Sequence, residues 1–215
     1  MGIKYYTISH IPKTTPHNRR PGIAMVPKYI TIHSTGNQTS TAQNERGWLT
    51  NPQNKRQASF HIVVDESEAI EVLPLNEVAW HAGDGNGQGN RASIGIEICE
   101  SGNRQKTLSN AVRLIAKMLK ERSWGVGCLR RHYDWSGKSC PRILMADSWQ
   151  GWKDFIAAVE KELKSVQAAK VIVNGKECEA VIIEGKTYVE VRKPFELAGF
   201  KVNYNPQTKI TEIVK

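Results

Sequence analysis

Four short stretches in the first half of the chain have the residue pattern of β-strands. Tyr29–His33 and Ser93–Glu100 place isoleucine at every second position, so that each stretch has one apolar face and one mixed face. Phe60–Asp65 and Ala69–Leu73 are rich in apolar residues and are separated by a polar turn. We therefore predict four strands.

Three further stretches have the apolar spacing of helices. The first is a short helix over Thr41–Asn51, and the second covers Leu108–Arg122 with one apolar stripe. The third begins at Ser148, a residue type that commonly caps helix N-termini, and carries apolar residues to Leu163. Residues 1–28 contain four prolines and several basic residues, and we expect an extended arm. Arg19 and Arg20 are expected to lie in a solvated basic loop.

The pattern changes after residues 167–169, where we place a short linker. Beyond it, short apolar stretches alternate with turn signals, among them Asn174-Gly175, a pair typical of tight β-hairpins. The expected organisation is a main domain over residues 1–166 and a small α+β module over residues 170–215. Modules of this size are marginally stable alone and often associate.

Composition narrows the class of protein. The chain has 215 residues, a formal net charge of +9 and no apolar run long enough to span a membrane. The first residues lack the apolar core of a signal peptide, so we expect the protein to be made in the cytoplasm and to stay there unless something else releases it. Four cysteines without paired spacing do not indicate a disulfide framework. The positive charge favours an anionic partner, but no dense basic block or zinc-finger motif points to nucleic acid.

The loop from His132 to Cys140 carries the clearest chemistry. An imidazole and a thiolate are common zinc ligands, and a catalytic zinc keeps three protein ligands and one open position. His33, at the carboxyl end of a predicted strand, is the preferred third ligand. His61 is a rival, but it lies inside a strand, so we interpret it as a hydrogen-bonded core histidine. A surface loop with a chance His and a buried Cys remains the alternative for the His132–Cys140 segment.

Two further segments have residues suited to a site. Trp80 and His81 begin a glycine-rich loop, which we expect to form the mobile rim of a cleft and to contact substrate. Glu97 lies within the strand Ser93–Glu100, on the same face as Gly95. A carboxylate at such a position is costly to bury unpaired, so it either lies on an exposed face or acts beside a cation.

Together these motifs resemble a known family. Residues 25–165 are similar to the zinc-dependent N-acetylmuramoyl-L-alanine amidases of phage endolysins and bacterial autolysins, which share a fold with peptidoglycan recognition proteins. The resemblance rests on five segments in the same order: Thr31-Ile32-His33-Ser34-Thr35, Ser59-Phe60-His61, Trp80-His81-Ala82-Gly83, Ile94-Gly95-Ile96-Glu97, and His132 with Cys140-Pro141-Arg142.

The resemblance implies an α/β fold, with a central mixed β-sheet flanked by helices. It implies zinc bound by His33, His132 and Cys140, with Glu97 and Lys138 as catalytic residues. One branch of the family has a catalytic tyrosine where this chain has a phenylalanine, Phe60, so the proton transfers are assigned to Glu97.

The implied activity is hydrolysis of the amide between N-acetylmuramic acid and L-alanine in bacterial peptidoglycan. A phage or prophage endolysin that acts on the cell wall after release is the expected context. Non-catalytic peptidoglycan binding is the alternative, although such relatives typically lack the cysteine ligand; a zinc-stabilised nucleic-acid-binding protein is more distant. For the C-terminal module, the sequence allows wall binding or a homodimer formed through strand edges.

Overall fold

The computed structural model describes residues 6–165, 167–183 and 186–215. The chain divides into two compact units, Met1–Leu163 and Lys164–Lys215. Val166, the predicted last residue of the first domain, lies outside the described residues. Within the described part of the chain, no helix is both long enough and apolar enough to cross a membrane.

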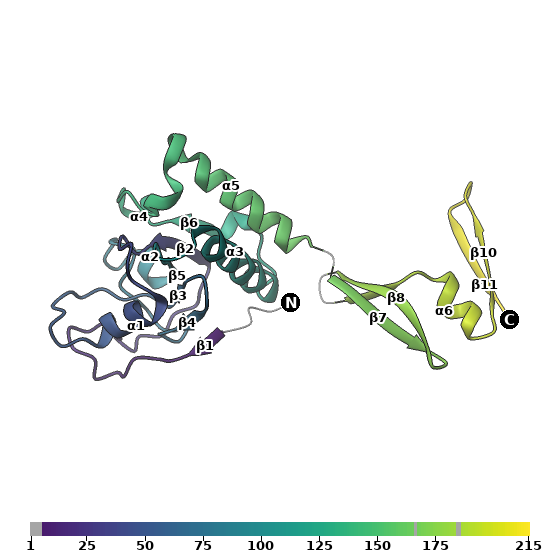
Figure 1. Cartoon of the computed structure of the whole chain (residues 1–215), viewed down its shortest axis with the longest axis horizontal. Helices are drawn as coiled ribbons and strands as arrows, with labels where there is room; N and C mark the ends of the chain where they lie inside the picture. Colours follow the sequence, from purple (N-terminus) through teal and green to yellow (C-terminus); the bar gives the residue numbers. More distant parts are fainter. Residues whose placement is uncertain (1–5, 166, 184–185) are drawn as a thin grey trace. The chain divides into compact units, whose positions relative to one another are not determined.

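The N-terminal unit is built on a six-stranded mixed sheet with the order β1-β4-β3-β5-β2-β6 (Figure 1). All neighbouring strands run parallel except β3 and β4, which are antiparallel. The predicted mixed sheet flanked by helices is therefore confirmed. The strands are β1 (Tyr6–Ile8), β2 (Tyr29–Ser34), β3 (Ile62–Val64), β4 (Ala69–Glu71), β5 (Ser93–Ile98) and β6 (Leu129–Arg131).

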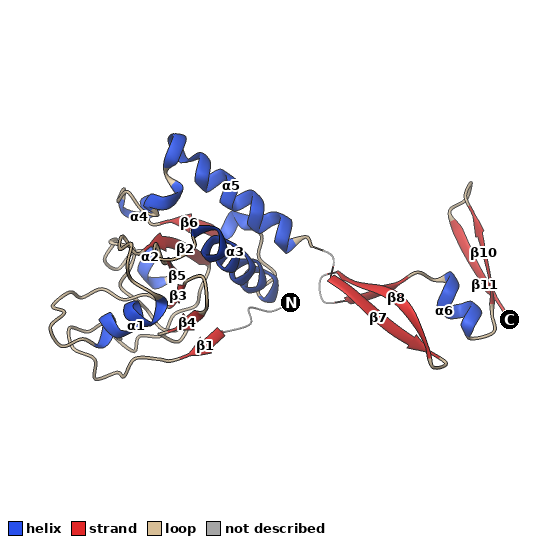
Figure 2. Cartoon of the chain, in the orientation of Figure 1, coloured by secondary structure: helices blue, strands red, loops and turns tan. Residues whose placement is uncertain are grey.

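One face of the sheet packs against two long helices, α3 (Arg104–Glu121) and α5 (Ala146–Leu163) (Figure 2). The alternating isoleucines of β2 and β5 point to this face and are fully buried. Burial of such side chains contributes about 1.5–3 kcal/mol each. The apolar half of the alternating pattern thus fixes which face of each strand meets the helices.

The opposite face of the sheet carries the residues of β2 and β5 that alternate with the isoleucines. β2 and β5 are parallel neighbours, and their register pairs Thr31 with Gly95 and His33 with Glu97. Paired residues in adjacent strands lie on the same side of the sheet. A second apolar cluster, which includes residues of helix α1 (Ala42–Thr50), covers part of this face.

Several local features differ from the sequence-based expectations. β6 was not predicted, α3 begins four residues earlier than expected, and the loop after His132 contains one helical turn, α4 (Tyr133–Ser136). The glycine-rich loop ends in the short helix α2 (Gln88–Arg91). Ser148 is not an extended N-cap, because it lies within the segment assigned to α5 with a φ of 54°. Two short 3-10 turns, η1 (Val126–Cys128) and η2 (Arg142–Leu144), complete the unit.

The N-terminal arm corrects one expectation directly. Arg19 is fully buried, and its guanidinium donates hydrogen bonds to the backbone carbonyls of Leu49, Asn54 and Arg56. Arg20 forms a bidentate ion pair with Glu77. The two arginines therefore hold the arm and the loop after α1 in place. They do not form a solvated basic loop.

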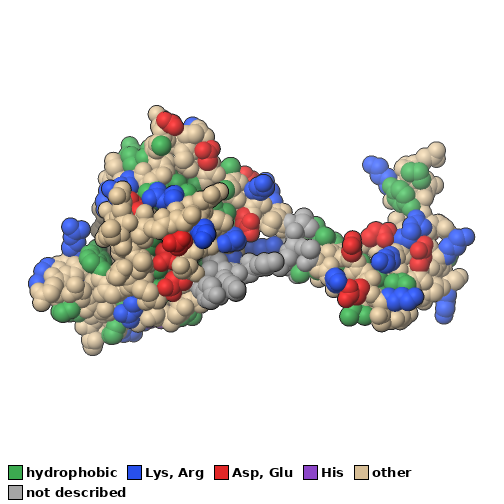
Figure 3. Space-filling model, viewed as in Figure 1, with side chains coloured by type: hydrophobic (Ala, Val, Ile, Leu, Met, Phe, Trp, Pro, Cys, Tyr) green, Lys and Arg blue, Asp and Glu red, His purple; other side chains and the backbone are tan. Residues whose placement is uncertain are grey.

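The C-terminal unit contains two small antiparallel sheets and one short helix. At the predicted hairpin, Asn174 and Gly175 have φ angles of 49° and 75°, the left-handed conformation that a tight two-residue turn requires. Figure 3 shows basic and acidic side chains intermixed on the visible face of each unit. The elements are β7 (Gln167–Val173), β8 (Lys176–Ile183), β9 (Lys186–Val189), α6 (Arg192–Leu197), β10 (Lys201–Asn205) and β11 (Ile210–Val214).

Candidate metal centre

Three buried side chains from two distant segments of the chain meet near the carboxyl end of β2. His33 lies near the carboxyl end of β2, and His132 directly follows β6, which runs parallel to β2. The Nδ1 atoms of the two imidazoles are 3.0 Å apart, and Cys140 Sγ lies 3.8 Å from His33 Nδ1. All three ligand atoms lie within 4.8 Å of one another. The cluster is able to hold a metal ion.

The segment between His132 and Cys140 folds back on itself, which brings its two ends together. One helical turn ends at Gly137, whose φ of 72° is a conformation that favours glycine. The Tyr133 amide then donates a 3.1 Å hydrogen bond to the Cys140 carbonyl. Beyond the loop, Arg142 binds the buried carboxylate of Glu100.

Glu97 lies beside the cluster because the strand register places it opposite His33. Its Oε1 is 3.9 Å from His33 Nδ1. Its Oε2 is buried and has no hydrogen-bond partner among the described residues. Burial raises the pKa of Glu97 to about 8, and the nearby Glu45 carboxylate adds to the increase, while Lys138 opposes it. The carboxyl group is therefore suited to accept and release protons near neutral pH.

The imidazoles of the site favour the neutral form. Burial is the main cause, and it lowers the pKa of His33 well below its ordinary value and that of His132 to about 4. Neighbouring histidines and Lys138 lower the pKa of His33 further. A neutral imidazole has a lone pair for a metal, so these surroundings suit metal binding. Burial also raises the pKa of the Cys140 thiol, to about 12.

His81 lies beneath the cluster. It is buried, its Nδ1 is 3.0 Å from His33 Nε2, and its Nε2 is 3.2 Å from the Ser93 carbonyl oxygen. Trp80 is half-buried and donates its indole N–H to the Asn18 carbonyl. The prediction that His81 and Trp80 contact substrate stays a prediction. The structure adds a contact of His81 with a cluster member.

Two hollows meet over the cluster. One, of about 270 Å³, is lined by His33, Glu97 and Cys140 together with Glu45 and Arg56. The other, of about 640 Å³, is lined mainly by uncharged polar residues of the glycine-rich loop and its neighbours. Both hollows share Ala58, Trp80, His81, His132 and Lys138. The exposed side chain of Lys138 therefore lies where the two hollows join.

His61 does not belong to the cluster. It is fully buried, its Nδ1 accepts a 2.9 Å hydrogen bond from the Gly95 amide, and its Nε2 donates to the Glu77 carbonyl at 2.8 Å. Both ring nitrogens are thus bonded to backbone groups. The interpretation of His61 as a hydrogen-bonded core histidine is confirmed.

Sequence reasoning missed two residues that shape the site. Buried Asn90 accepts hydrogen bonds from the amides of His81 and Ala82, each at 2.8 Å, and so holds the loop backbone. Glu45 of α1 lines the smaller hollow. No pattern around Asn90 signals its role, but Gly95 does give a signal for the position of His81, because glycine inside a strand often marks close approach of another group.

Comparison with known proteins agrees with this geometry. Residues 23–143 match the family model Amidase_2, described as N-acetylmuramoyl-L-alanine amidase. The N-acetylmuramoyl-L-alanine amidase XlyB of Bacillus subtilis (strain 168) is 44% identical over 196 residues, an alignment that covers 89% of this chain and 58% of XlyB. The chain thus covers less than two thirds of that relative's length.

Solved structures give the same result. The catalytic domain of XlyA is 43% identical, with a TM-score of 0.66, and the match covers 72% of this chain and 98% of that domain. A mutant endolysin from Bacillus subtilis is also 43% identical with a TM-score of 0.66, covering 74% of this chain and 99% of the other. The family match spans more than half of the chain and includes the three cluster residues, and the chain therefore belongs to the N-acetylmuramoyl-L-alanine amidase family.

Proposed function

We propose that this protein is a zinc-dependent N-acetylmuramoyl-L-alanine amidase that hydrolyses bacterial peptidoglycan, in the manner of a prophage endolysin. The observation that carries the proposal is the buried cluster of His33, His132 and Cys140 with the Glu97 carboxyl group beside it. A non-catalytic binding module has no use for a carboxyl group that holds a buried, unpartnered oxygen next to a ligand cluster.

The donor set fits zinc. Two imidazole nitrogens and one thiolate leave a fourth tetrahedral position open, as in catalytic zinc sites. Ideal tetrahedral bond lengths imply separations of about 3.3 Å between ligand nitrogens and about 3.6 Å between nitrogen and sulfur. The distances of 3.0 Å and 3.8 Å measured from His33 Nδ1 are close to both values. Zinc bound there would polarise the scissile carbonyl and make water easier to deprotonate.

Glu97 is proposed to move the protons of the reaction. Its unpartnered Oε2 faces no competing donor among the described residues, so it is available to a water molecule. Glu97 accepts a proton from the attacking water and then gives it to the leaving nitrogen of L-alanine. The amide bond breaks, and the products are a lactyl carboxylic acid and a free amine.

Lys138 is proposed to stabilise the negative charge that develops on the carbonyl oxygen. Its side chain lines both hollows, and a positive charge held near that oxygen favours the transition state. Trp80 and His81, which line both hollows, are proposed to contact the substrate at the same junction. The two hollows leave room for the substrate on both sides of its scissile amide.

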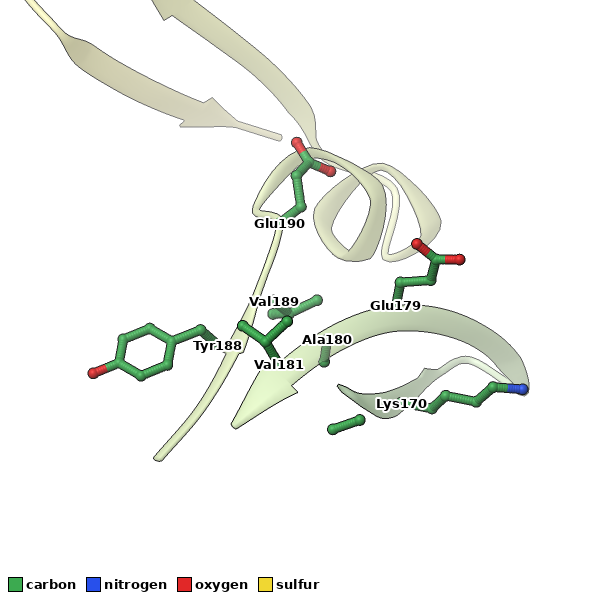
Figure 4. A pocket seen from close by; sticks show the side chains of 8 residues that line it. Lys170, Glu179, Ala180, Val181, Tyr188, Val189 and Glu190 are labelled. Carbon is green, nitrogen blue, oxygen red and sulfur yellow. The ribbon is translucent and has the colours of Figure 1, made fainter. Parts of the chain in front are cut away.

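We further propose that the C-terminal unit anchors the enzyme to the wall. Its three-stranded sheet has a surface hollow lined by Ala180, Val181, Tyr188 and Val189, with Lys170, Glu179 and Glu190 at its margin (Figure 4). The alignment with XlyB leaves out fewer residues than this unit contains, so it extends into the unit. A homodimer formed through its strand edges is the competing role.

The test is hydrolysis of purified bacterial cell walls by the full chain loaded with zinc. We expect soluble fragments and new free N-terminal alanine, both abolished by a chelator and restored by added zinc. Glu97→Gln is the matched variant, because the amide keeps the shape but cannot act as a base. It should retain zinc and lose about 10²–10⁴-fold in rate.

Two results would contradict the proposal. New reducing ends in place of free alanine would mean that a glycosidic bond is cut. A Glu97→Gln enzyme with a rate within a few-fold of the parent would remove Glu97 from the chemistry. Zinc content and thermal melting of the variant serve as controls for folding.

A further inference from the structure

The hydrogen bonds beneath the metal centre have a definite direction. The Ser93 carbonyl oxygen can only accept, so the Nε2 atom of His81, 3.2 Å away, must carry a hydrogen and donate it. A second hydrogen on His81 would give the ring a positive charge in a buried position next to the imidazoles of His33 and His61, which burial strongly disfavours. The Nδ1 atom of His81 is therefore an acceptor.

This acceptor determines the state of His33. The Nε2 atom of His33 lies 3.0 Å from His81 Nδ1, so it must donate the hydrogen between them. A neutral imidazole has one hydrogen, and His33 Nδ1 is then left with a free lone pair. That atom is the one that faces His132 and Cys140.

We propose that His81 is a positioning residue that fixes the tautomer and orientation of His33, so that His33 Nδ1 is ready to bind the metal. The inference rests on the proposed metal at this cluster. It assigns His81 a role through another residue and not as a ligand. The hydrogen-bond chain runs from the Ser93 carbonyl through His81 and His33 to the cluster.

Other contacts hold His81 in this position. Asn90 Oδ1 accepts hydrogen bonds from the His81 and Ala82 amides, each at 2.8 Å. A Cβ atom on Gly95 would come within 2.7–2.9 Å of three atoms of the His81 ring, so only glycine leaves room for the ring there. These contacts fix both the backbone and the ring of His81 relative to the cluster.

The test compares the zinc affinity of the full chain and three variants by competition with a chelator. His81→Phe keeps an aromatic ring but removes the acceptor, and we expect zinc affinity to fall roughly 10–100-fold, the usual cost of losing such a partner. His81→Asn places an amide oxygen near the position of Nδ1 and should restore affinity to within a few-fold of the parent. His61→Phe is the matched control, because it alters a buried histidine that packs beside the His81 ring but whose two ring nitrogens are hydrogen-bonded only to backbone groups. It should lower thermal stability without changing zinc affinity.

A direct measurement keeps the proposal testable if His81→Phe does not fold. Long-range proton–nitrogen NMR spectra of the zinc-loaded parent, labelled at histidine, report which nitrogen of His33 carries the hydrogen. We expect hydrogen on Nε2. Hydrogen on Nδ1, or a His81→Phe affinity equal to that of the parent, would overturn the inference. A parent chain that binds no zinc would instead overturn the proposed function.

Discussion

His33, His81, His132 and His61 are the same residue type in four different settings. His61 has both nitrogens bonded to backbone groups of neighbouring segments, whereas His33 and His132 turn one nitrogen toward Cys140. Burial lowers the pKa of His61 to about 4, below its ordinary value of 6.5. The Gly95 amide points at Nδ1, so a proton there would break that hydrogen bond.

This lowered pKa predicts a loss of stability in mild acid. Between pH 6.5 and about 4 the unfolded chain binds a proton at residue 61 and the folded chain does not, so the free energy of unfolding falls as the pH falls. The full effect is on the order of 3 kcal/mol. The contribution of His61 is isolated when the free energies of unfolding of the parent and of His61→Asn are measured by denaturant at matched zinc content. The variant should lose less stability than the parent over this range, and equal slopes would contradict the prediction.

Part of the site follows from single residues in the sequence, and part does not. Period-two alternation placed His33 and Glu97 on the faces opposite the isoleucines, which is where they lie. The same reasoning could not show that Arg19 is buried, because arginine is usually exposed. The three backbone carbonyls that bind Arg19 belong to another segment of the chain. Loop residues such as His81 depend on tertiary contacts that a pattern does not encode.

At the scale of elements, β5 is the strand that positions both Glu97 and His81. Its pairing with β2 places Glu97 opposite His33, and its Gly95 leaves space for the His81 ring. β6 was missed because it has three residues, two of them arginine, and shows no alternation. Its parallel pairing with β2 nevertheless determines the position of His132, the first residue of the loop that ends at Cys140.

The close approach of the His81 ring to Gly95 predicts the effect of a larger residue at this position of β5. Gly95→Ala introduces a methyl group within 3 Å of the His81 ring, so either the ring or the strand must move. We expect a destabilisation of about 1–3 kcal/mol, as for other overpacked sites, and weaker zinc binding.

Gly127→Ala is the matched control for this strand variant, because no atom lies within 4 Å of the added methyl group. Thermal melting and chelator competition measure both effects. A Gly95→Ala protein with the melting temperature and zinc affinity of Gly127→Ala would show that the His81 position is not constrained by the strand.

At the scale of the whole molecule, the residues of the proposed chemistry lie in one unit and the proposed wall anchor is the other. The cluster residues, Glu97 and Lys138 all lie in the unit Met1–Leu163. The second unit leaves several large apolar side chains exposed, among them Ile172, Tyr204 and Ile210. Such residues suit a surface that binds a partner.

Truncation after Leu163 tests this separation. The shortened protein should bind zinc as the full chain does and hydrolyse small soluble muropeptides at a similar rate, while its activity on whole walls falls. Sedimentation of the isolated C-terminal unit with purified walls measures binding directly. A unit that stays in the supernatant, together with a full-chain dimer that disappears on truncation, would favour self-association over anchoring.

The cluster joins two segments that are far apart along the chain, since His33 and Cys140 are separated by 107 positions in the sequence. During synthesis on the ribosome, a growing chain has no complete donor set until the loop after β6 has emerged and β6 has paired with β2. Capture of the proposed metal would thus come late in synthesis, and a nascent fragment that ends before His132 would hold only one of the three donors.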